Sequence, residues 1–344
     1  MKKLFLTALS IGCITQASYG IDINVGTGTC NGSYVAICSQ MDAEVRELVE
    51  GDLPDVDLGQ YATGIANANS FAYKGMGSDY SDKYDLLMVK VTGGGAFQGD
   101  ASNPEKAEGI GIGAALTAGV NLDLLPIDKI GFIDLSKLDL SFSVMSYNVD
   151  QKQDSTQVNG DIGHFSVMAR YQLVDSIDVI PGYMFQWGGV FLHTGLHRQT
   201  MDAKIVQSFT DQQVEVSGQS ATFQDANATF NIDSTTLTIP VEVSTHLRTL
   251  WALTFFGGAG FDIVSGSTDI NLTASGNING GSGGNTYANT INASELNNGD
   301  AEATNFRAFG GLQFNLPFVR LTTHFNKGLG NDLMGFNVGA KFLW

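Results

Sequence analysis

The sequence predicts an all-β protein: a transmembrane, antiparallel, up-and-down β-barrel of about ten strands (about 8–14), preceded by a short helix-containing segment. Three observations support this prediction. Apolar and polar residues alternate with a period of two over long stretches, which is the pattern of a strand with two different faces. The 344 residues include 42 Gly and 21 Phe, and only 15% are charged. The mean hydropathy of +0.03 is too polar for a helical membrane protein and suits a barrel that shows every second residue to lipid.

The N-terminal residues predict a signal peptide, which we assign to residues 1–20. Two lysines precede an apolar run from 4 to 14, and small residues follow, which is the order of a secretory signal. A membrane anchor would need about 20 apolar residues, and this run is shorter. We expect cleavage after Ala17 or Gly20 and therefore an exported protein.

The three cysteines have different expected roles. Cys13 lies in the predicted signal peptide and could instead be a lipoprotein acceptor, but Ser10 stands where that motif has Leu. Cys30 and Cys38 would survive processing, and an even pair in an exported chain predicts a disulfide that closes a small loop. The chain-entropy estimate for such a loop is about 2–3 kcal/mol. A metal or redox role is less favoured because the spacing is not Cys-x-x-Cys.

The net charge of −17 argues against nucleic acid as a partner, because phosphate binding needs a basic surface. Acidic residues in the expected loops could attract divalent cations such as Ca²⁺, although their spacing matches no calcium-loop motif. These residues are Asp202, Asp211, Asp225, Asp269, Glu295 and Asp300.

Residues 21–83 differ from the rest of the chain. Ser39 can cap a short helix, and Gly51 followed by Pro54 would end it. The stretch from 59 to 77 is rich in Gly, Ala and Asn and has too little apolar content to fold alone. We expect it to need a cavity or a sheet edge, so that residues 21–83 form a periplasmic or lumen-inserted segment before a barrel of residues 84–344.

The two-residue period persists from Leu86 onward. Leu237, Ile239 and Val241, for example, alternate with Thr236, Thr238 and Glu242. The expected strands cover 86–98, 110–124, 138–144, 164–173, 180–197, 236–248, 251–263, 306–315, 319–326 and 333–344. The strands of a soluble β-sandwich, the main alternative, average about five or six residues, and most of these are longer. Because lipid cannot satisfy the polar groups of an open sheet edge, long strands in a membrane must close into a barrel.

The last ten residues continue this pattern to the end of the chain. Trp344, Phe342 and Val338 share one apolar face. Lys341 and Asn337 lie on the other face. A final strand with an aromatic end resembles the closing strand of Gram-negative, porin-like outer-membrane β-barrels. The resemblance implies that Phe342 and Trp344 are the signal recognised by the barrel-assembly machinery, and that outer-membrane lipid and lipopolysaccharide surround the protein.

The same resemblance implies on which side of the membrane each connection lies, because the last strand of such barrels ends in the periplasm. Counting backwards places compact periplasmic turns at 125–134, 175–180, 248–250 and 316–318. The outer loops are then 99–109, 149–160, 198–233, 265–302 and 327–332. Longer outer loops and shorter periplasmic turns are typical of these proteins. An even strand count would also leave the N-terminal segment, with its cysteine pair, in the periplasm.

Two expected outer loops have different compositions. Loop 265–302 is rich in Asn, Gly, Ser and Thr, and we expect it to be mobile. Loop 198–233 contains Val206, Phe209 and Phe223, which suggest strands that extend above the membrane.

Charged residues and histidines gather on the face that the pattern places inside. The lumen-lining candidates are Lys90, Lys137, His164, Arg170, His193, His197, Glu242, His246, Arg248, Asp262, Arg307, Arg320, His324 and Lys341. Stability alone requires charged side chains to point inward, since a charge on the lipid face costs about 2–4 kcal/mol near the midplane. The lumen could therefore be filled with paired charges, or it could be a narrow, mildly cationic aqueous path.

Other chemistry is less favoured by the sequence. His193 and His197 would lie about 13 Å apart on a strand, at about 3.3 Å per residue, which is too far to share one metal ion. Gly111 and Gly113 lie within a strand and do not form a phosphate loop. The chain also resembles omptin proteases and outer-membrane acyl hydrolases in barrel size, but no local pattern joins a nucleophile to a base. We expect no catalytic residue, metal or cofactor.

Three functions follow in order of preference. The first is a narrow channel or uptake pore for small solutes. The second is a structural or surface-interaction barrel with a side-chain-filled lumen, which displays loops 198–233 and 265–302. The third is an outer-membrane hydrolase. A short segment before a barrel is also similar, more distantly, to FadL-type transporters, whose N-terminus plugs the pore. The solute and the oligomeric state are not specified by the sequence.

Overall fold

The computed structural model of the protein describes residues 22–26, 28–52, 57–76, 78–80, 87–99, 108–180, 185–209, 211–250, 252–282 and 284–343. The expected signal peptide and Trp344 of the expected assembly signal lie outside these residues. Within them, the helices are too short or too polar to cross a membrane on their own.

Ten consecutive antiparallel strands form a closed ring, which confirms the predicted all-β up-and-down barrel. They are β3 (Leu87–Gln98), β4 (Gly109–Asn121), β7 (Leu138–Gln153), β8 (Thr156–Val174), β10 (Phe185–Ser208), β12 (Gln219–Thr249), β13 (Leu253–Ser282), β15 (Thr304–Asn315), β16 (Arg320–Gly328) and β17 (Leu333–Leu343). The ring closes where β17 pairs with β3, with Lys341 opposite Lys90. Each strand lies close to one of the predicted ranges, because the two faces of a barrel wall impose opposite residue types.

The exterior of the ring is apolar. Exposed side chains on successive strands form a belt of Val91, Leu116, Phe142, Val144, Phe165, Val167, Leu196, Leu237, Ile239, Val241, Val243, Phe255, Ile263, Phe306, Phe314, Leu321, Phe325, Phe336, Val338 and Phe342. An apolar belt of this kind around a closed barrel is the surface that a transmembrane β-barrel presents to lipid.

One end of the barrel, here called the turn end, carries the compact connections. They contain β5 (Lys129–Ile130), β6 (Ile133–Asp134), β9 (Ile177–Ile180) and the 3-10 turns η3 (Leu122–Leu124) and η4 (Leu135–Lys137). The first residues of β3 and the last residues of β17 lie at the same end. The positions of these connections agree with the predicted turns.

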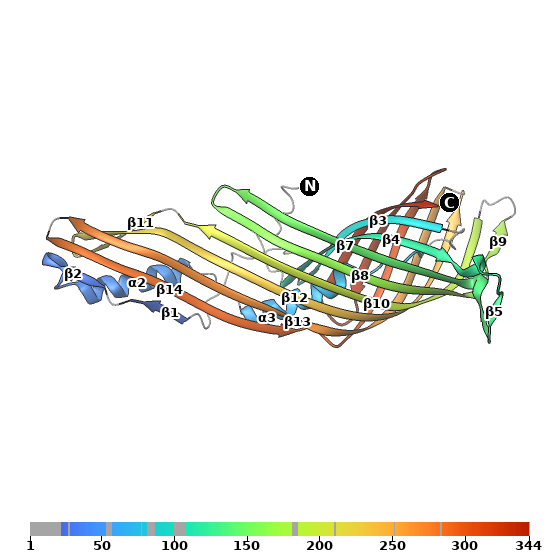
Figure 1. Cartoon of the computed structure of the whole chain (residues 1–344), viewed down its shortest axis with the longest axis horizontal. Coiled ribbons are helices and arrows are strands. Elements are labelled where there is room, and N and C mark those ends of the chain that lie inside the picture. Colours follow the sequence, from blue (N-terminus) through green and yellow to red (C-terminus); the bar gives the residue numbers. More distant parts are fainter. Residues whose placement is uncertain are drawn as a thin grey trace.

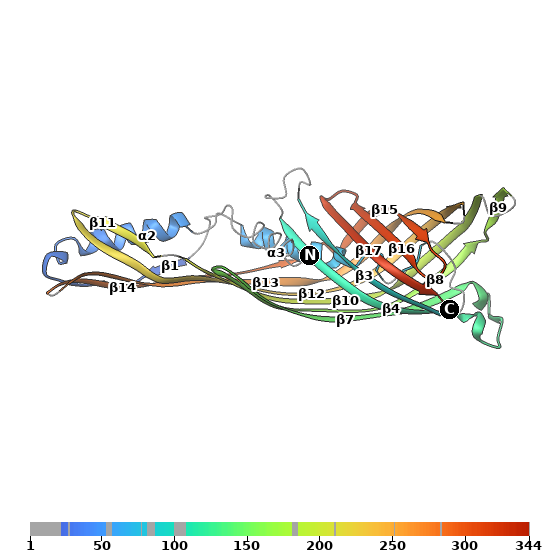
Figure 2. The ribbon, with the colours of Figure 1, turned by 90° about the horizontal axis from the view of Figure 1, so that it is seen from above.

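At the other end, six strands continue as a long curved sheet, here called the extension (Figures 1 and 2). It consists of the distal parts of β7, β8, β10, β12 and β13, together with β14 (Asn285–Asp300), which pairs with the distal half of β13. The short strands β2 (Thr29–Asn31) and β11 (Gln212–Val216) lie near its far tip, and β1 (Asp22–Val25) pairs with the middle of β14. The molecule is therefore elongated, with the barrel at one end.

The extension corrects two expected loops. Residues 265–302 are not a mobile loop but the β13–β14 hairpin, in which Ser267 to Ser282 pair with Asn285 to Asp300. Residues 149–160 are also mostly strand, since only Asp154 and Ser155 separate β7 from β8. By contrast, the strands predicted within 198–233 are present. Apolar residues on the concave face stabilise the hairpin, among them Ile270, Leu272 and Ile278.

The N-terminal segment contributes one 3-10 turn and two helices. The turn η1 (Gly32–Tyr34) and α2 (Cys38–Asp52) lie at the tip of the extension, and α3 (Leu58–Ala72) lies at the mouth of the barrel (Figures 1 and 2). Asp57 caps α3, accepting a hydrogen bond from the Gln60 backbone N–H at 3.0 Å. Helix α2 begins one residue before the predicted cap at Ser39, whereas α3 was not predicted.

Candidate functional site

The candidate site is the lumen, which is occupied by the protein's own chain. The first half of α3 packs on the apolar concave face of the extension. The second half and the described residues that follow it, as far as Tyr80, are buried among the inward side chains of the ring. We call residues 58–80 the lumen segment. Its polar groups bond to strands from around the ring.

Most of the predicted lumen-lining residues are buried inside the ring. They are Lys90, His164, Arg170, His193, His197, Glu242, His246, Asp262, Arg307, His324 and Lys341. Three others, Lys137, Arg248 and Arg320, lie near the turn end and are partly exposed. Lys137 forms an ion pair with Asp175 at 2.6 Å at the surface.

Arg307 is the centre of the largest ionic network. Its guanidinium is fully buried and donates through Nε to Asp262 at 3.0 Å, through Nη1 to Asn326 at 2.7 Å, and through Nη2 to Glu242. Three strands, β12, β13 and β15, supply these charges, and β16 supplies Asn326. A buried arginine needs such partners, because an uncompensated charge in the interior costs several kcal/mol.

Two residues of the lumen segment complete this network. Lys74 Nζ lies 3.2 Å from Asp262 Oδ1, and both side chains are buried. Tyr80 donates its hydroxyl proton to Glu242 Oε2 at 2.6 Å. The two acids of the ring therefore pair with Arg307 on the wall and with the lumen segment at the same time.

A second set of contacts joins the lumen segment to the strands that close the ring. Lys341 on β17 donates to Asp79, and both side chains are buried. Lys90 on β3 donates to the carbonyl oxygens of Gly75 at 3.3 Å and Ser78 at 3.0 Å. Asn337 on β17 donates to the carbonyl oxygen of Lys74 at 2.8 Å. At the β17–β3 seam, Lys341 is thus paired with a carboxylate of the lumen segment, and Lys90 is hydrogen-bonded to its backbone carbonyl oxygens.

Close backbone packing brings α3 against the wall. A Cβ at Gly111 would lie 2.3 Å from the Ala68 carbonyl oxygen, and a Cβ at Gly64 would lie 2.1 Å from the Glu108 carbonyl oxygen. Only glycine permits such an approach. The glycines predicted to lie in a strand, Gly111 and Gly113, therefore form the inward surface of β4 that receives the helix.

Aromatic rings fill the space beside the ionic network. The Tyr80 ring is stacked on His324 with centroids 5.1 Å apart, and Phe256 and Phe309 lie within 5.5 Å of it. Tyr73 is stacked on His164 with centroids 3.9 Å apart. These contacts exclude water from the ion pairs, which strengthens their attraction.

His193 and Ser244 form the arrangement most similar to a hydrolytic pair. His193 Nε2 lies 2.7 Å from Ser244 Oγ, but the other ring nitrogen has no hydrogen-bond partner among the described residues. Both side chains are buried, and Tyr80 packs on the imidazole at 4.9 Å. A Ser–His pair needs a third group that orients the base and a path for substrate. We therefore assign this pair to packing.

The described part of the chain contains no obvious metal-binding site. No group of three or more His, Cys, Asp or Glu side chains there has the geometry to hold an ion. His193 and His197 both lie on strand β10, as predicted, and they contact different neighbours. His193 contacts Ser244, whereas His197 stacks on His164 with centroids 5.8 Å apart.

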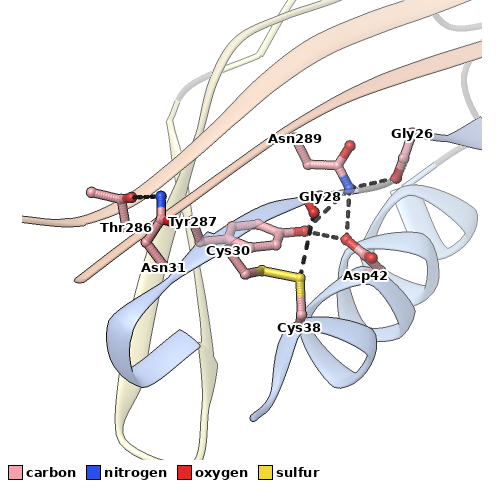
Figure 3. Close-up of a disulfide and its surroundings, with 9 residues drawn as sticks. All are labelled: Gly26, Gly28, Cys30, Asn31, Cys38, Asp42, Thr286, Tyr287 and Asn289. Atoms are coloured by element: carbon pink, nitrogen blue, oxygen red, sulfur yellow. Dashed lines mark hydrogen bonds between the residues drawn. A yellow bond between two sulfur atoms is a disulfide. The ribbon is translucent and has the colours of Figure 1, made fainter. Parts of the chain in front are cut away.

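The cysteine pair is bonded as predicted, but its location differs from the prediction. Cys30 and Cys38 form a disulfide that joins β2 to the start of α2. Beside it, Asp42 accepts hydrogen bonds from Tyr287 and Asn289, both at 2.7 Å (Figure 3). This cluster lies on β14 at the tip of the extension, opposite the turn end, so the prediction that the pair shares the side of the periplasmic turns is wrong. The cause is the lumen segment, which carries the chain from the tip back to β3 through the barrel.

Sequence reasoning did not assign Lys74, Asp79 and Tyr80 to the site. They lie in or just after a stretch that was judged by its low apolar content. A better signal was a helical spacing of mostly apolar residues, three or four apart, followed by one lysine and one aspartate. The spaced residues are Leu58, Tyr61, Ala62, Ile65, Ala68 and Asn69.

A closed ring of ten antiparallel strands with an apolar exterior and buried inward charges has the features of a transmembrane β-barrel protein. The chain belongs to the Lsa36-like family, whose model matches residues 26–344. No curated protein matches the sequence.

The comparison with solved structures gives matches of low identity and low TM-score. The translocator domain of the autotransporter NalP from Neisseria meningitidis has 9% identity and a TM-score of 0.34, with 80% of this chain and 93% of that chain covered. The CymD monoaromatic hydrocarbon channel has 6% identity and a TM-score of 0.25, with 82% and 98% covered. The transport unit of the autotransporter AIDA-I from Escherichia coli has 9% identity and a TM-score of 0.23, with 80% and 96% covered. These scores are low, and the barrel assignment rests on the strand pairing described above.

Proposed function

We propose that the protein is a closed surface barrel, in which the lumen segment fills the pore and the barrel anchors the long extension outside the cell. This corresponds to the structural or surface-interaction alternative from the sequence. The observation that carries it is the burial of residues 58–80 among inward side chains of the ring.

The electrostatics of the lumen support a closed state. Lys74 and Asp79 each pair with a buried wall residue, Asp262 and Lys341 respectively. Separating such pairs without water leaves charges in a low-dielectric interior, so the segment can leave only if water replaces it. The resting barrel should therefore not conduct ions.

The direction of the extension follows from general barrel anatomy. Compact turns lie on the periplasmic side of outer-membrane barrels and long connections lie outside. By this rule we infer that the extension, with α2 and the disulfide, lies at the cell surface. The disulfide then lies in an oxidising environment.

The outward face of the extension carries a row of carboxylates. Asp161, Asp202, Asp233 and Asp269 are consecutive cross-strand partners on β8, β10, β12 and β13, and all four are exposed. Like charges directly opposite each other destabilise a sheet. The row supports the expectation that divalent cations associate with the outer acidic residues, since a cation would offset the repulsion.

The second candidate is the first choice from the sequence, a narrow channel that opens when the lumen segment moves. One observation favours it. The ring nitrogens of His164 and Oγ of Ser166 are buried and make no hydrogen bond within the described part of the chain. These groups would meet water if the segment left, and they would then line a polar path.

Conductance in planar bilayers separates the two candidates. The closed barrel predicts no discrete steps for the wild-type protein and stable steps after deletion of residues 21–83. Steps from the wild-type protein at low voltage would favour the channel. A silent deletion variant that still shows heat-modifiable gel migration would contradict the idea that this segment blocks the pore.

A further inference from the structure

The chain passes through the closed ring before it forms the first strand of that ring. Strands β1 and β2 and helix α2 lie on the extension, α3 lies at the mouth, and the described residues after α3 are buried in the lumen (Figures 1 and 2). Strand β3 then begins at the turn end, where Met88 pairs with Leu343 of β17. The N-terminal residues and the start of the barrel therefore lie at opposite ends of the lumen.

This path requires the N-terminal residues to cross the outer membrane. The predicted signal peptide delivers the chain to the periplasm. The turn end corresponds to the periplasmic side and the extension to the cell surface, so this step rests on the orientation in the proposed function. Residues 22–52, here called the tip segment, must then move from the periplasm to the surface, although the barrel follows them in the sequence.

The tip segment takes its core from the extension. Tyr34 and Met41 are buried against Ile278 of β13 and Tyr287 of β14. Strands β1 and β2 each pair with β14 and not with each other. A short segment that cannot bury enough apolar surface by itself stays unfolded until a partner supplies that surface. In the periplasm the tip segment is therefore an unfolded chain.

The lumen is wide enough for one chain and too narrow for a folded unit. A ten-stranded barrel is little wider than an eight-stranded one, whose interior is filled by side chains. The second half of α3 already touches the wall, since a Cβ at Gly111 would lie 2.3 Å from the Ala68 carbonyl oxygen. A helix with its side chains is about 10–12 Å across. An unfolded tip segment fits this space, whereas a folded domain does not.

We propose that the barrel exports its own N-terminus: the tip segment passes unfolded through the lumen and folds on the extension at the cell surface. The contacts that hold it form only on the outer side. Tyr34 donates its hydroxyl proton to the Ser220 carbonyl oxygen at 2.6 Å, and the Ser33 backbone N–H donates to Asn285 at 3.0 Å. Folding at the tip thus opposes return of the chain, and the lumen segment enters last and fills the pore.

The first test follows two reporters in intact cells. A flexible peptide tag directly before Asp22 reports on the tip segment, and Thr235→Cys, at an exposed outward position of β12, reports on the extension. The proposal predicts that an antibody reaches the tag and a membrane-impermeant maleimide reaches the cysteine without permeabilisation.

The other outcomes separate this proposal from the proposed function. A labelled cysteine with a tag that is detected only after permeabilisation would overturn export of the N-terminus and leave the orientation of the extension intact. A cysteine that is labelled only after permeabilisation would refute the orientation, and with it both ideas.

A second arm tests passage through the lumen. A small, rapidly folding domain is inserted between the tag and Asp22, and it is compared with the same domain carrying core substitutions that keep it unfolded. In barrels with normal heat-modifiable migration, the unfolded domain should bring the tag to the surface, and the folded domain should hold it in the periplasm. A surface tag on the folded domain would overturn passage through the lumen.

Two matched variants test the role of folding at the tip. Tyr34→Ala removes a buried ring and its hydrogen bond, whereas Val35→Ala shortens the neighbouring side chain, which is 62% exposed. Most of the surface signal from the tag should be lost in Tyr34→Ala and retained in Val35→Ala, with normal heat-modifiable migration in both. Equal surface signals from the two variants would contradict retention by folding at the tip.

Discussion

Replacing Asp79 by Asn should release the lumen segment from the barrel. Asp79 is 3% exposed and accepts a hydrogen bond from Lys341, which is 1% exposed. The variant leaves the lysine buried without this carboxylate while the segment is inside, whereas water can solvate the lysine once the segment has left. The closed state is therefore destabilised relative to the open one.

The size of this effect follows from measurements on buried ion pairs. Removing one partner typically costs about 3–5 kcal/mol. Since about 1.4 kcal/mol corresponds to a factor of ten, the ratio of open to closed barrels should rise by roughly 10²–10⁴-fold. A barrel that is silent in its wild-type form should then show frequent openings.

Single-channel recording in planar bilayers measures this change. Asp332→Asn is the control, because Asp332 pairs with Lys327 at 3.6 Å at the surface and is 78% exposed. Such surface pairs contribute little. The reasoning would be refuted if Asp79→Asn were as silent as the control while both proteins migrate as folded barrels.

Three further predictions concern the tip and the helix. Joint replacement of Cys30 and Cys38 by Ser should make α2 sensitive to protease, because a disulfide that closes a loop over eight residues stabilises the folded state by about 2–3 kcal/mol. The gel migration of the heated and unheated barrel should not change. Burial, with the hydrogen bond to a carboxylate, raises the pKa of Tyr287, so the contribution of this residue to stability is complete below about pH 10 and is lost as pH rises further. The protection of the α2 amides from hydrogen exchange, relative to the intrinsic exchange rate at each pH, should therefore fall above this pH. The Tyr287→Phe variant should lack that fall. Gly111→Val should keep α3 out of the barrel, since a Cβ there would lie 2.3 Å from the Ala68 carbonyl oxygen, and persistent conductance would reveal this; a silent variant would show that the helix adapts.

The barrel itself was predictable because lipid and lumen select opposite residue types. On β12, for example, Leu237 and Ile239 face lipid, whereas Thr236 and Thr238 are buried inside. Every strand of the ring repeats this contrast over enough residues to be recognised. The disulfide was predictable for a different reason, the presence of two cysteines in an exported chain.

The extension was harder to predict because the alternation changes phase along single strands. On β13, Asp262 faces inward in the barrel, but Ile270 and Leu272 face inward in the extension, with Asp269 outside. The concave face changes from a polar lumen to an apolar core under α3. Because polar residues are expected inside a barrel, the alternation no longer indicates a strand beyond this change, and residues 265–302 are predicted as a loop.

Lumen insertion was one of the two positions expected for residues 21–83, but helix α3 was not predicted, because its stability comes from tertiary contacts. Gly64 disfavours a helix in isolation, and small residues such as Gly64 and Ala68 offer little apolar area, but they allow backbone contact with Gly109 and Gly111. The pattern of the sequence does not indicate which charged residues pair with Lys74 and Asp79. Their partners, Asp262 and Lys341, lie far along the chain, and only the closed ring brings them together.

The most direct test of the occupied lumen is a cross-link between α3 and the inner wall in native outer membranes. Asn69 donates to Ser234 Oγ at 3.1 Å, and both side chains are buried and uncharged. The pair Asn69→Cys with Ser234→Cys should form a disulfide on mild oxidation, whereas Asn69→Cys with Thr235→Cys should not, because Thr235 faces outward. Failure of the first pair to cross-link in a folded barrel, or equal cross-linking of both pairs, would contradict a lumen filled by residues 58–80.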